Sequence, residues 1–190
     1  MDTATDRLTG IVAFLQGAER LKDTLRSGHT GQGRRESVAE HSWRLCLFAM
    51  LLERDTDVDL LKLLKLCVIH DLGEAISGDV PATDQCAGDG REARERADFL
   101  TLCAPLPEDL RTEMAALWDE YAGAASPEAR MAKGLDKIET ILQHVAGSNP
   151  DDFDYAFNLD YGRARTEADP ILKALRELAD RATRARMDGG

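Results

Sequence analysis

Several features are scarce in this sequence of 190 residues. Aromatic residues make up only 5% of it, while Leu and Ala are abundant, which favours helices over sheet. No stretch approaches the ~18–20 uninterrupted apolar residues that are needed to span a bilayer, so we expect no membrane partner. The first residues lack a basic segment followed by an apolar one, and we therefore expect no signal peptide.

Cysteine is also rare. The four cysteines, Cys46, Cys67, Cys86 and Cys103, show no CxxC spacing, and two of them lie in apolar segments of helical character. Such residues suit free, buried thiols in a reducing compartment. We therefore expect a cytoplasmic protein without disulfides.

Positively charged residues are fewer than negatively charged ones. The sequence has 24 Lys and Arg residues and 35 Asp and Glu residues, which gives a formal net charge of −11. Such a surface repels phosphate polymers, and no stripe of Lys and Arg with interleaved aromatics offsets it. We therefore expect no nucleic-acid partner. A small anionic substrate is compatible with this charge if a metal ion and a few arginines reverse the local field.

Apolar residues recur at helical spacing along most of the chain. Ser37 and Glu40 form a capping box, Asp59 is the N-cap of a nearly continuously apolar helix, and Ser126-Pro127 begins another. The polar, Gly-rich segment 27–36 is expected to be a loop. The pattern predicts an all-α single domain with helices at about 8–26, 37–54, 59–70, 90–103, 107–122, 127–146 and 165–186.

Two imidazoles and two carboxylates occupy unusual positions in these helices. His41 follows the capping box, His70 and Asp71 end the apolar run 60–69, and Asp136 lies among apolar residues. Burying such groups is costly unless something holds them, and an ionised Asp71 needs a strong partner. A lone histidine on an apolar face is more often a core residue, but three helices that converge on one point would form a metal site.

The sequence contexts of these residues carry a family resemblance. They are Ser-Val-Ala-Glu-His-Ser-Trp (37–43), Ile-His-Asp-Leu-Gly-Glu (69–74) with Gly-Asp-Val-Pro (78–81), and Gly-Leu-Asp-Lys-Ile-Glu (134–139). Together they resemble the H…HD…D signature of HD-domain metal-dependent phosphohydrolases, most closely the small branch that holds the 5′-deoxynucleotidases. The resemblance implies an HD-type helical bundle over 1–190, with a metal-site core at about 17–146 and a covering C-terminal helix at about 165–186. It also implies a homodimer.

The resemblance assigns His41, His70, Asp71 and Asp136 as metal ligands. Two carboxylates neutralise a divalent ion, and mixed imidazole and carboxylate ligands suit Mn²⁺, Co²⁺, Fe²⁺, Ni²⁺ or Zn²⁺ without discriminating among them. Relatives with two metals have extra histidines between the HD pair and the last Asp. This chain has none there, since its other histidines are His29 and His144. We therefore expect one ion per chain.

The resemblance also suggests catalytic and substrate contacts. Glu74, one turn after His70, matches a catalytic Glu and is the candidate general acid or base. Asp79 matches a position that contacts the sugar hydroxyl, although an Asx-turn is an equal alternative. Arg26 matches a phosphate-binding Arg, and Glu120 lies in a recurrent acidic segment that we expect to line the pocket.

The chain departs from part of the family after Arg26. Some relatives have a Trp there that is implicated in rejecting the ribose 2′-hydroxyl, whereas this chain has Ser27. Discrimination against ribonucleotides is therefore in doubt unless a neighbour such as His29 fills the gap. Trp43 and Trp118 are expected in the core or an interface rather than as platforms for a base.

These observations predict a metal-dependent phosphohydrolase that removes the 5′-phosphate from (deoxy)ribonucleoside monophosphates. Three alternatives remain at this stage. The enzyme could act on another phosphorylated metabolite, a nucleoside triphosphate or a nucleotide analogue. An HD-type oxygenase would need two irons, and the missing histidines argue against it. A non-catalytic nucleotide-binding module would be favoured by a lost ligand, yet all four are present.

Overall fold

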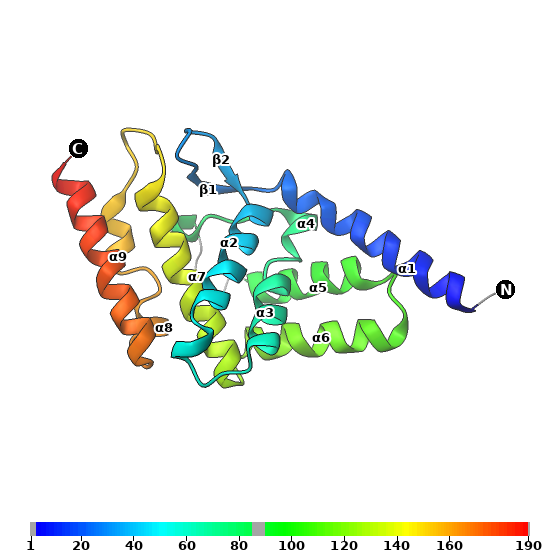
Figure 1. Ribbon diagram of the computed structural model, residues 1–190. Coiled ribbons are helices and arrows are strands. Elements are labelled where there is room, and N and C mark those ends of the chain that lie inside the picture. The colour runs from blue at the N-terminus through cyan, green and yellow to red at the C-terminus, as the bar shows by residue number, and fades with distance from the viewer. Residues whose placement is uncertain (1–2, 85–89, 190) are drawn as a thin grey trace.

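The computed structural model describes residues 3–84 and 90–189, which form a helical bundle with one small sheet (Figure 1). The mainly α-helical bundle expected from the sequence is confirmed. Cys86 lies outside the described residues. The helices are α1 Thr3–Ala18, α2 Val38–Leu51, α3 Leu60–Ile69, α4 Glu74–Ser77, α5 Arg91–Cys103, α6 Glu108–Ala122, α7 Pro127–Ala146, α8 Arg163–Thr166 and α9 Pro170–Asp188, with 3₁₀ turns η1 Glu19–Lys22, η2 Glu53–Asp55, η3 Ala82–Asp84 and η4 Tyr155–Leu159, and strands β1 Leu25–His29 and β2 Arg35–Ser37.

The predicted N-caps begin three helices. The Ser37 hydroxyl accepts a hydrogen bond from the Glu40 amide, and the Glu40 carboxylate accepts one from the Ser37 amide, so the capping box is complete. Asp59 accepts from the Lys62 amide at the start of α3, and Ser126 caps α7. These caps fix where α2, α3 and α7, the three helices that carry the site, enter the bundle.

Two sequence expectations were wrong in detail. The first helix ends at Ala18 rather than near residue 26, and the expected loop 27–36 contains most of an antiparallel hairpin of β1 and β2. The amide of Thr30 donates to the carbonyl of Arg34, and Gly33 takes a positive φ of 80° in this turn. The strands are short and carry no alternation of apolar and polar residues, so the sequence did not indicate a hairpin.

The C-terminal helix also begins later than expected. Asp169 caps α9 by accepting from two backbone amides, and Pro170 occupies the first helical position, where its missing N–H costs nothing. The preceding residues form the separate short helix α8. The helix α9 packs along α7, as a covering helix should.

The core consists of two apolar clusters. One joins α2, α3, α7 and α9 and includes Leu45, Leu66 and Leu135. The other lies beneath η1, α4, α5 and α6, where the rings of Phe99 and Trp118 stack 5.9 Å apart. The central helix α3 packs against α2, α6 and α7 and contributes to both clusters.

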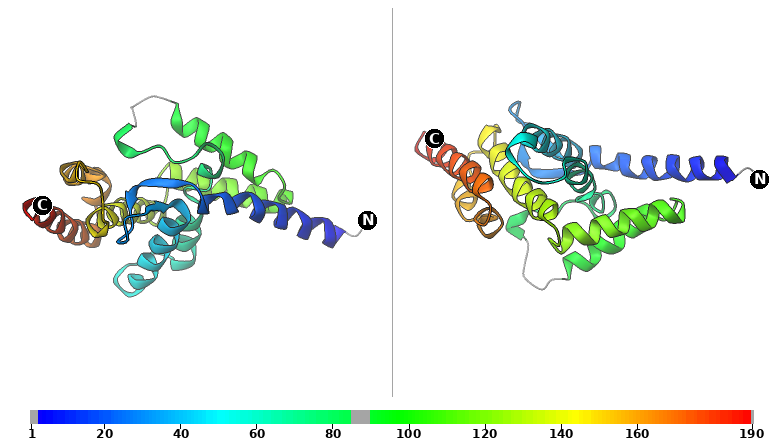
Figure 2. Two further views of the ribbon diagram at one scale, coloured as in Figure 1. Left: turned by 90° about the horizontal axis from the view of Figure 1, so that it is seen from above. Right: turned by 60° about the horizontal axis from the view of Figure 1, so that its bottom comes forward.

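A glycine sets the distance between α7 and α9. A Cβ atom added at Gly134 would lie 2.3 Å from Cδ1 of Leu172, so a larger residue fits only if the Leu172 side chain moves. At the opposite end of the molecule, α1 projects away from the bundle (Figures 1 and 2). None of the described helices is long and apolar enough to cross a membrane.

Candidate metal centre

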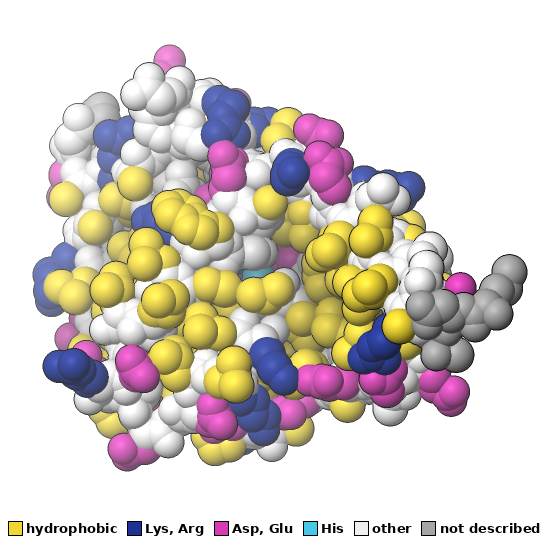
Figure 3. Space-filling model, turned by 45° about the vertical axis from the view of Figure 1, so that its right-hand side comes forward, with side chains coloured by type: hydrophobic (Ala, Val, Ile, Leu, Met, Phe, Trp, Pro, Cys, Tyr) yellow, Lys and Arg dark blue, Asp and Glu magenta, His cyan; other side chains and the backbone are white. Residues whose placement is uncertain are grey.

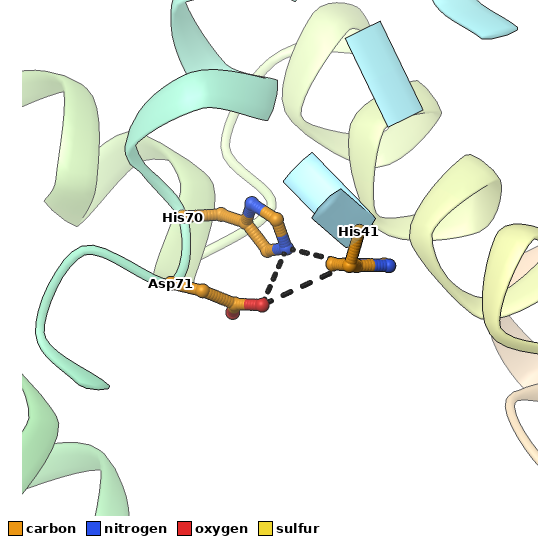
Figure 4. Close-up of side chains that lie close together, drawn as sticks. All are labelled: His41, His70 and Asp71. Carbon is orange, nitrogen blue, oxygen red and sulfur yellow. Dashed lines mark hydrogen bonds and ion pairs between the residues drawn. The ribbon is translucent and has the colours of Figure 1, made fainter. Parts of the chain in front are cut away.

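Three helical segments bring the four predicted ligands together. His41 comes from α2, His70 and Asp71 follow the end of α3, and Asp136 comes from α7. The Nε2 atoms of His41 and His70 lie 3.3 Å apart, and Oδ2 of Asp71 lies 3.0 Å from the latter and 3.8 Å from the former (Figure 4). Oδ1 of Asp136 lies 3.3 Å and 4.0 Å from the same two nitrogens. The donor atoms therefore converge on one point.

Hydrogen bonds on the far side of each imidazole orient the rings. Nδ1 of His70 lies 2.8 Å from the carbonyl oxygen of Cys67, which can only accept, so this nitrogen carries the proton. Nδ1 of His41 likewise lies 2.5 Å from Oε2 of Glu139. Both Nε2 atoms consequently point inward at each other, and each offers a lone pair there when its imidazole is neutral. Such a pair needs a cation between them, and these residues therefore fit a divalent metal ion.

The electrostatics of the cluster also favour a cation. Burial lowers the pKa of His41, but the carboxylates of Glu139 and Asp136 outweigh it and raise that pKa to about 9. Burial opposes ionisation of Asp71, yet the imidazoles of His70 and His41 hold its pKa at about 2. The imidazoles are thus surrounded by ionised carboxylates, so positive charge is stabilised at the centre.

A second acidic residue lies behind His41. Glu36, the middle residue of β2, is 4% exposed, and burial followed by the charge of Glu139 raises its pKa to about 7. A carboxylate oxygen of Glu36 and one of Glu139 lie with a His41 nitrogen within 4.8 Å of one another. Because Nδ1 of His41 is hydrogen-bonded to Glu139, we interpret these two glutamates as groups that hold the ligand rather than as a second metal site.

Arg26 on β1 lies beside the ligands. Its guanidinium contacts Oδ2 of Asp71 at 3.3 Å, the hydroxyl of Thr140 at 3.0 Å and Oε2 of Glu36 at 3.5 Å. The hairpin therefore places the arginine where α3 and α7 meet. Only 12% of its side chain is exposed, so this charge is held rigidly at the edge of the site.

Glu74 and Asp79 face the same pocket. Burial, followed by the negative charges of Asp71 and Asp79, raises the pKa of Glu74 to about 10. Its Oε2 atom is buried and has no hydrogen-bond partner in the described structure. Burial also raises the pKa of Asp79, while Arg26 opposes this. In the absence of a metal ion, Glu74 thus holds a proton at neutral pH.

One part of the pocket wall is cationic. The pocket has a volume of about 570 Å³, and Lys133, Lys137 and Arg165 line it. Nζ of Lys137 lies 2.9 Å from Oδ2 of Asp136, and Nζ of Lys133 lies 4.3 Å from the centre of the Tyr121 ring. Within the described chain, neither Lys133 nor Arg165 has a carboxylate within ion-pair distance. Unpaired cations that share one wall favour an anionic ligand.

Comparison with known proteins agrees with this geometry. The family model described as HD domain matches residues 18–176. The chain belongs to the HD-domain family. Among its HD-domain relatives, 5′-deoxynucleotidase HDDC2 of Mus musculus is 35% identical over 136 residues, which cover 70% of this chain and 68% of the relative. The 5′-deoxynucleotidase hdd1 of Schizosaccharomyces pombe is 33% identical, with 70% of each chain covered.

Two solved structures have a similar overall fold. The crystal structure of a predicted metal-dependent phosphohydrolase from Magnetospirillum magnetotacticum MS-1 superimposes with a TM-score of 0.77 at 29% identity, over 96% of each chain. A conserved hypothetical protein from Pyrococcus furiosus gives a TM-score of 0.66 at 28% identity, over 91% of this chain and 99% of that one.

The structure gathers all but one of the residues singled out from the sequence. His70, Asp71, Asp136, Glu74, Asp79 and Arg26 line the pocket, and His41 lies directly behind it. Glu120 does not line the pocket, because it faces α3 and pairs with Lys62 at 2.7 Å.

Sequence reasoning missed the residues that support the ligands. Glu139 and Lys137 lie within the segment 134–139 that carries Asp136. Their positions one and three residues after Asp136 could therefore have indicated that they lie near the site. The sequence around Glu36 and Lys133 showed no such signal, because their roles depend on how the strand β2 and the helix α7 pack against the rest of the bundle.

Proposed function

We propose that this HD-domain protein is a metal-dependent phosphohydrolase that removes the 5′-phosphate from nucleoside monophosphates, deoxyribonucleotides among them. One divalent ion is held by His41, His70, Asp71 and Asp136. The observation that carries the proposal is the convergence of two imidazole Nε2 atoms and two carboxylates at the edge of a pocket that the cations Lys133, Lys137 and Arg165 also line. The names of the relatives support the substrate class.

The site divides the work of phosphoester hydrolysis among its groups. When bound, the ion supplies Lewis-acid chemistry, which acidifies water and polarises a phosphoryl oxygen. Arg26 and the wall of Lys133, Lys137 and Arg165 neutralise the phosphate from two sides. Arg26 is already paired with Asp71 and Glu36, so the wall contributes the charge that the phosphate dianion still requires.

Glu74 handles the proton. Water attacks phosphorus in line with O5′, the P–O5′ bond breaks, and the leaving alkoxide takes a proton from Glu74, which regains a proton from the water that attacked. Two features support this role. The Oε2 atom of Glu74 is buried without a hydrogen-bond partner, and burial beside Asp71 and Asp79 favours the protonated form.

The sugar lies against the hairpin and the loop after α4. Asp79 accepts a hydrogen bond from a sugar hydroxyl, and the positive φ of 85° at Gly78 turns the chain there. Ser27 and His29 line the pocket on β1, and Nδ1 of His29 is buried without a partner. His29 therefore lines the sugar side of the pocket without replacing the bulky indole, so a ribose 2′-hydroxyl is tolerated there. We assign no substrate contact to Glu120, because Lys62 holds it elsewhere.

Further parts of the proposal are independent of the chemistry. The chain is a homodimer that works in the cytoplasm. The described thiols, Cys46, Cys67 and Cys103, are free, which suits a reducing compartment. A second candidate substrate class is the nucleoside triphosphates, because three cationic side chains, Lys133, Lys137 and Arg165, line the pocket in addition to Arg26. A non-catalytic module is disfavoured, since every group that hydrolysis needs faces one pocket.

The test measures phosphate release from nucleoside mono-, di- and triphosphates and from a phosphorylated sugar, with Mn²⁺, Co²⁺ or Mg²⁺. We expect inorganic phosphate from the nucleoside monophosphates only. Release of tripolyphosphate from triphosphates would assign the enzyme to the second class. Turnover of none of these compounds with any of the metals would contradict the proposal.

A further inference from the structure

The chain that follows α7 returns along this helix and brings three aromatic rings to the pocket. Phe153, Phe157 and Tyr161 stand four residues apart, and all three line the pocket and are partly exposed. Phe157 belongs to η4, which packs against both α7 and α9 (Figure 1). We define the aromatic ledge as Phe153, Phe157 and Tyr161.

The ledge extends from the metal ligands to the far end of α7. At the near end, Nζ of Lys137 donates a hydrogen bond to the hydroxyl of Tyr161 at 3.0 Å, next to the ligand Asp136. At the far end, the ring of Phe153 meets that of His144 edge-on at 4.9 Å. Asp136 and His144 lie two turns apart on α7, which separates them by about 12 Å along the helix axis. An extended nucleoside monophosphate can bridge such a span from its phosphate to its base.

His144 also lies against the strand that we place beside the sugar. A Cβ atom added at Gly28 on β1 would lie 3.2 Å from Cδ2 of His144. Next to it, Nε2 of Gln143 donates to the carbonyl oxygen of His29 at 2.7 Å. The groups along the pocket therefore follow the order of a nucleotide, with the metal ligands first, then the sugar-facing strand, and then His144 with the ledge.

One nitrogen of His144 is free to accept a hydrogen bond from a ligand. Nδ1 of His144 lies 2.8 Å from Oδ1 of Asn158, which can only accept, so this nitrogen carries the proton. Burial lowers the pKa of His144, so the imidazole is neutral at pH 7 and its Nε2 atom is an acceptor. Among residues 3–84 and 90–189, Nε2 has no hydrogen-bond partner. The side chain is only 5% exposed and lines the pocket.

The other aromatic side chains that line the pocket are already engaged. Trp118 is buried and stacks on Phe99, and the ring of Tyr121 is buried beneath Nζ of Lys133. Exposed apolar side chains do not by themselves mark a base site, because the face drawn in Figure 3 is rich in them, with charged residues mostly towards its margins. Trp43 on α2 is 66% exposed but does not line the pocket. Of the described aromatic residues, only those of the ledge are both partly exposed and in the pocket.

We propose that the aromatic ledge and Nε2 of His144 form a nucleobase site, in which the base stacks on the ledge and one base N–H donates to His144. The inference rests on the proposed function and adds which part of the substrate is recognised. Stacking accepts every base, because each has a π face, and a single acceptor excludes only a base that directs no N–H towards it. Purine and pyrimidine nucleotides are therefore both substrates, whereas a phosphorylated sugar without a base is a poor one.

The first experiment compares dAMP with 2-deoxyribose 5-phosphate, which lacks the base, on the wild type and on Phe157→Leu. Leucine keeps an apolar side chain but removes the π face. We expect kcat/KM for dAMP to fall by ~10-fold in the variant, while that for 2-deoxyribose 5-phosphate changes by less than about twofold. Phe14→Leu is the matched control, because Phe14 is a partly buried phenylalanine on α1 outside the pocket. It should leave both values close to the wild type.

A third substrate tests the contact with His144. Purine 2′-deoxyriboside 5′-monophosphate is dAMP without its amino group, so it donates no hydrogen bond from that edge. On the wild type its kcat/KM should be ~3–10-fold below that of dAMP, the usual contribution of one hydrogen bond between neutral groups. On His144→Phe the two substrates should be equal. Equal values on the wild type would overturn the contact with His144.

Calorimetric titration of the metal-free protein with dAMP, in chelator, separates this inference from the proposed activity. It measures affinity without turnover, and Phe157→Leu should raise the dissociation constant by ~10-fold. A wild type that binds dAMP more tightly than Phe157→Leu but hydrolyses nothing would support the ledge and contradict the proposed function. Equal affinity of the two proteins for dAMP would overturn the ledge as the base site. So would a loss of kcat/KM in Phe157→Leu that is the same for dAMP and for 2-deoxyribose 5-phosphate.

Discussion

Replacing Glu74 by Gln should change the stability of the metal-free protein in a pH-dependent way. Burial beside Asp71 and Asp79 raises the pKa of Glu74 to about 10 in the folded chain, whereas the unfolded value is about 4.5. Between these values the folded chain binds one proton more than the unfolded chain. The free energy of unfolding therefore falls as pH rises through this window, by at most about 1.4 kcal/mol per pH unit. Gln carries no such proton.

The advantage of the Gln variant over the wild type should consequently grow with pH. From pH 6 to pH 8 the stability difference between the variant and the wild type can grow by at most about 2.7 kcal/mol. Partial solvent access to the carboxyl reduces the expected growth to ~1–2 kcal/mol. For a chain of this length, that corresponds to a gain of roughly 2–8 °C in Tm relative to the wild type. Thermal melts of both proteins in chelator at several pH values measure it. A difference in Tm that does not change with pH, or that shrinks as pH rises, would refute this reasoning.

The same variant should be nearly inactive when metal is present. It should keep the metal and its affinity for nucleotide, while turnover falls by ~10²–10⁴-fold, the usual loss of a general acid or base. Glu95→Gln is the matched control, because Glu95 also lines the pocket but is paired with Arg91 at 3.1 Å. That control should retain turnover close to the wild type.

The remaining predictions concern the ligands, the cationic wall and the sugar. Asp71→Ala should lose metal and turnover together, and full metal occupancy by elemental analysis would contradict its role as a ligand. Lys133→Met should raise KM for a deoxynucleoside monophosphate by ~10-fold without changing metal content, since a charged hydrogen bond contributes about 1.5–3 kcal/mol. Lys173→Met on α9 is the control. An unchanged KM in the Lys133 variant would mean that Lys133 does not contact the substrate. With Ser27 in place of an indole, kcat/KM should favour dAMP over AMP by about tenfold or less, and a preference well beyond a hundredfold would mean that the sugar-facing wall is misplaced.

The helices that carry the ligands could be predicted because their signals are local. Capping at Ser37, Asp59 and Ser126 depends on residues within one turn, and apolar spacing follows from the helical period. The hairpin could not be predicted in this way. Its pairing of Leu25 with Ser37 joins residues twelve positions apart, and the strands are too short and polar to show alternation.

The cluster of His41, His70, Asp71 and Asp136 could be predicted because their sequence contexts resemble a family signature and because buried imidazoles and carboxylates are rare in apolar helices. Their supporting groups depend on tertiary packing instead. Glu139 is placed against His41 by the contact of α7 with α2, and the Arg26 guanidinium reaches Thr140 only because β1 lies beside α7. Glu120 is the opposite case, a residue that was predicted in the pocket but lies elsewhere. Its motif context suggested the pocket, but its position on α6 turns it towards Lys62.

The central claim is that one divalent ion, held by His41, His70, Asp71 and Asp136, supports hydrolysis of nucleoside monophosphates. The most direct test returns Mn²⁺ or Co²⁺ in steps to chelator-treated protein while bound metal per chain and dAMP hydrolysis are measured on the same samples. The account predicts no hydrolysis without metal, and activity that rises in proportion to bound metal and saturates at one ion per chain. Hydrolysis that persists without metal, or that requires a second ion per chain, would contradict it.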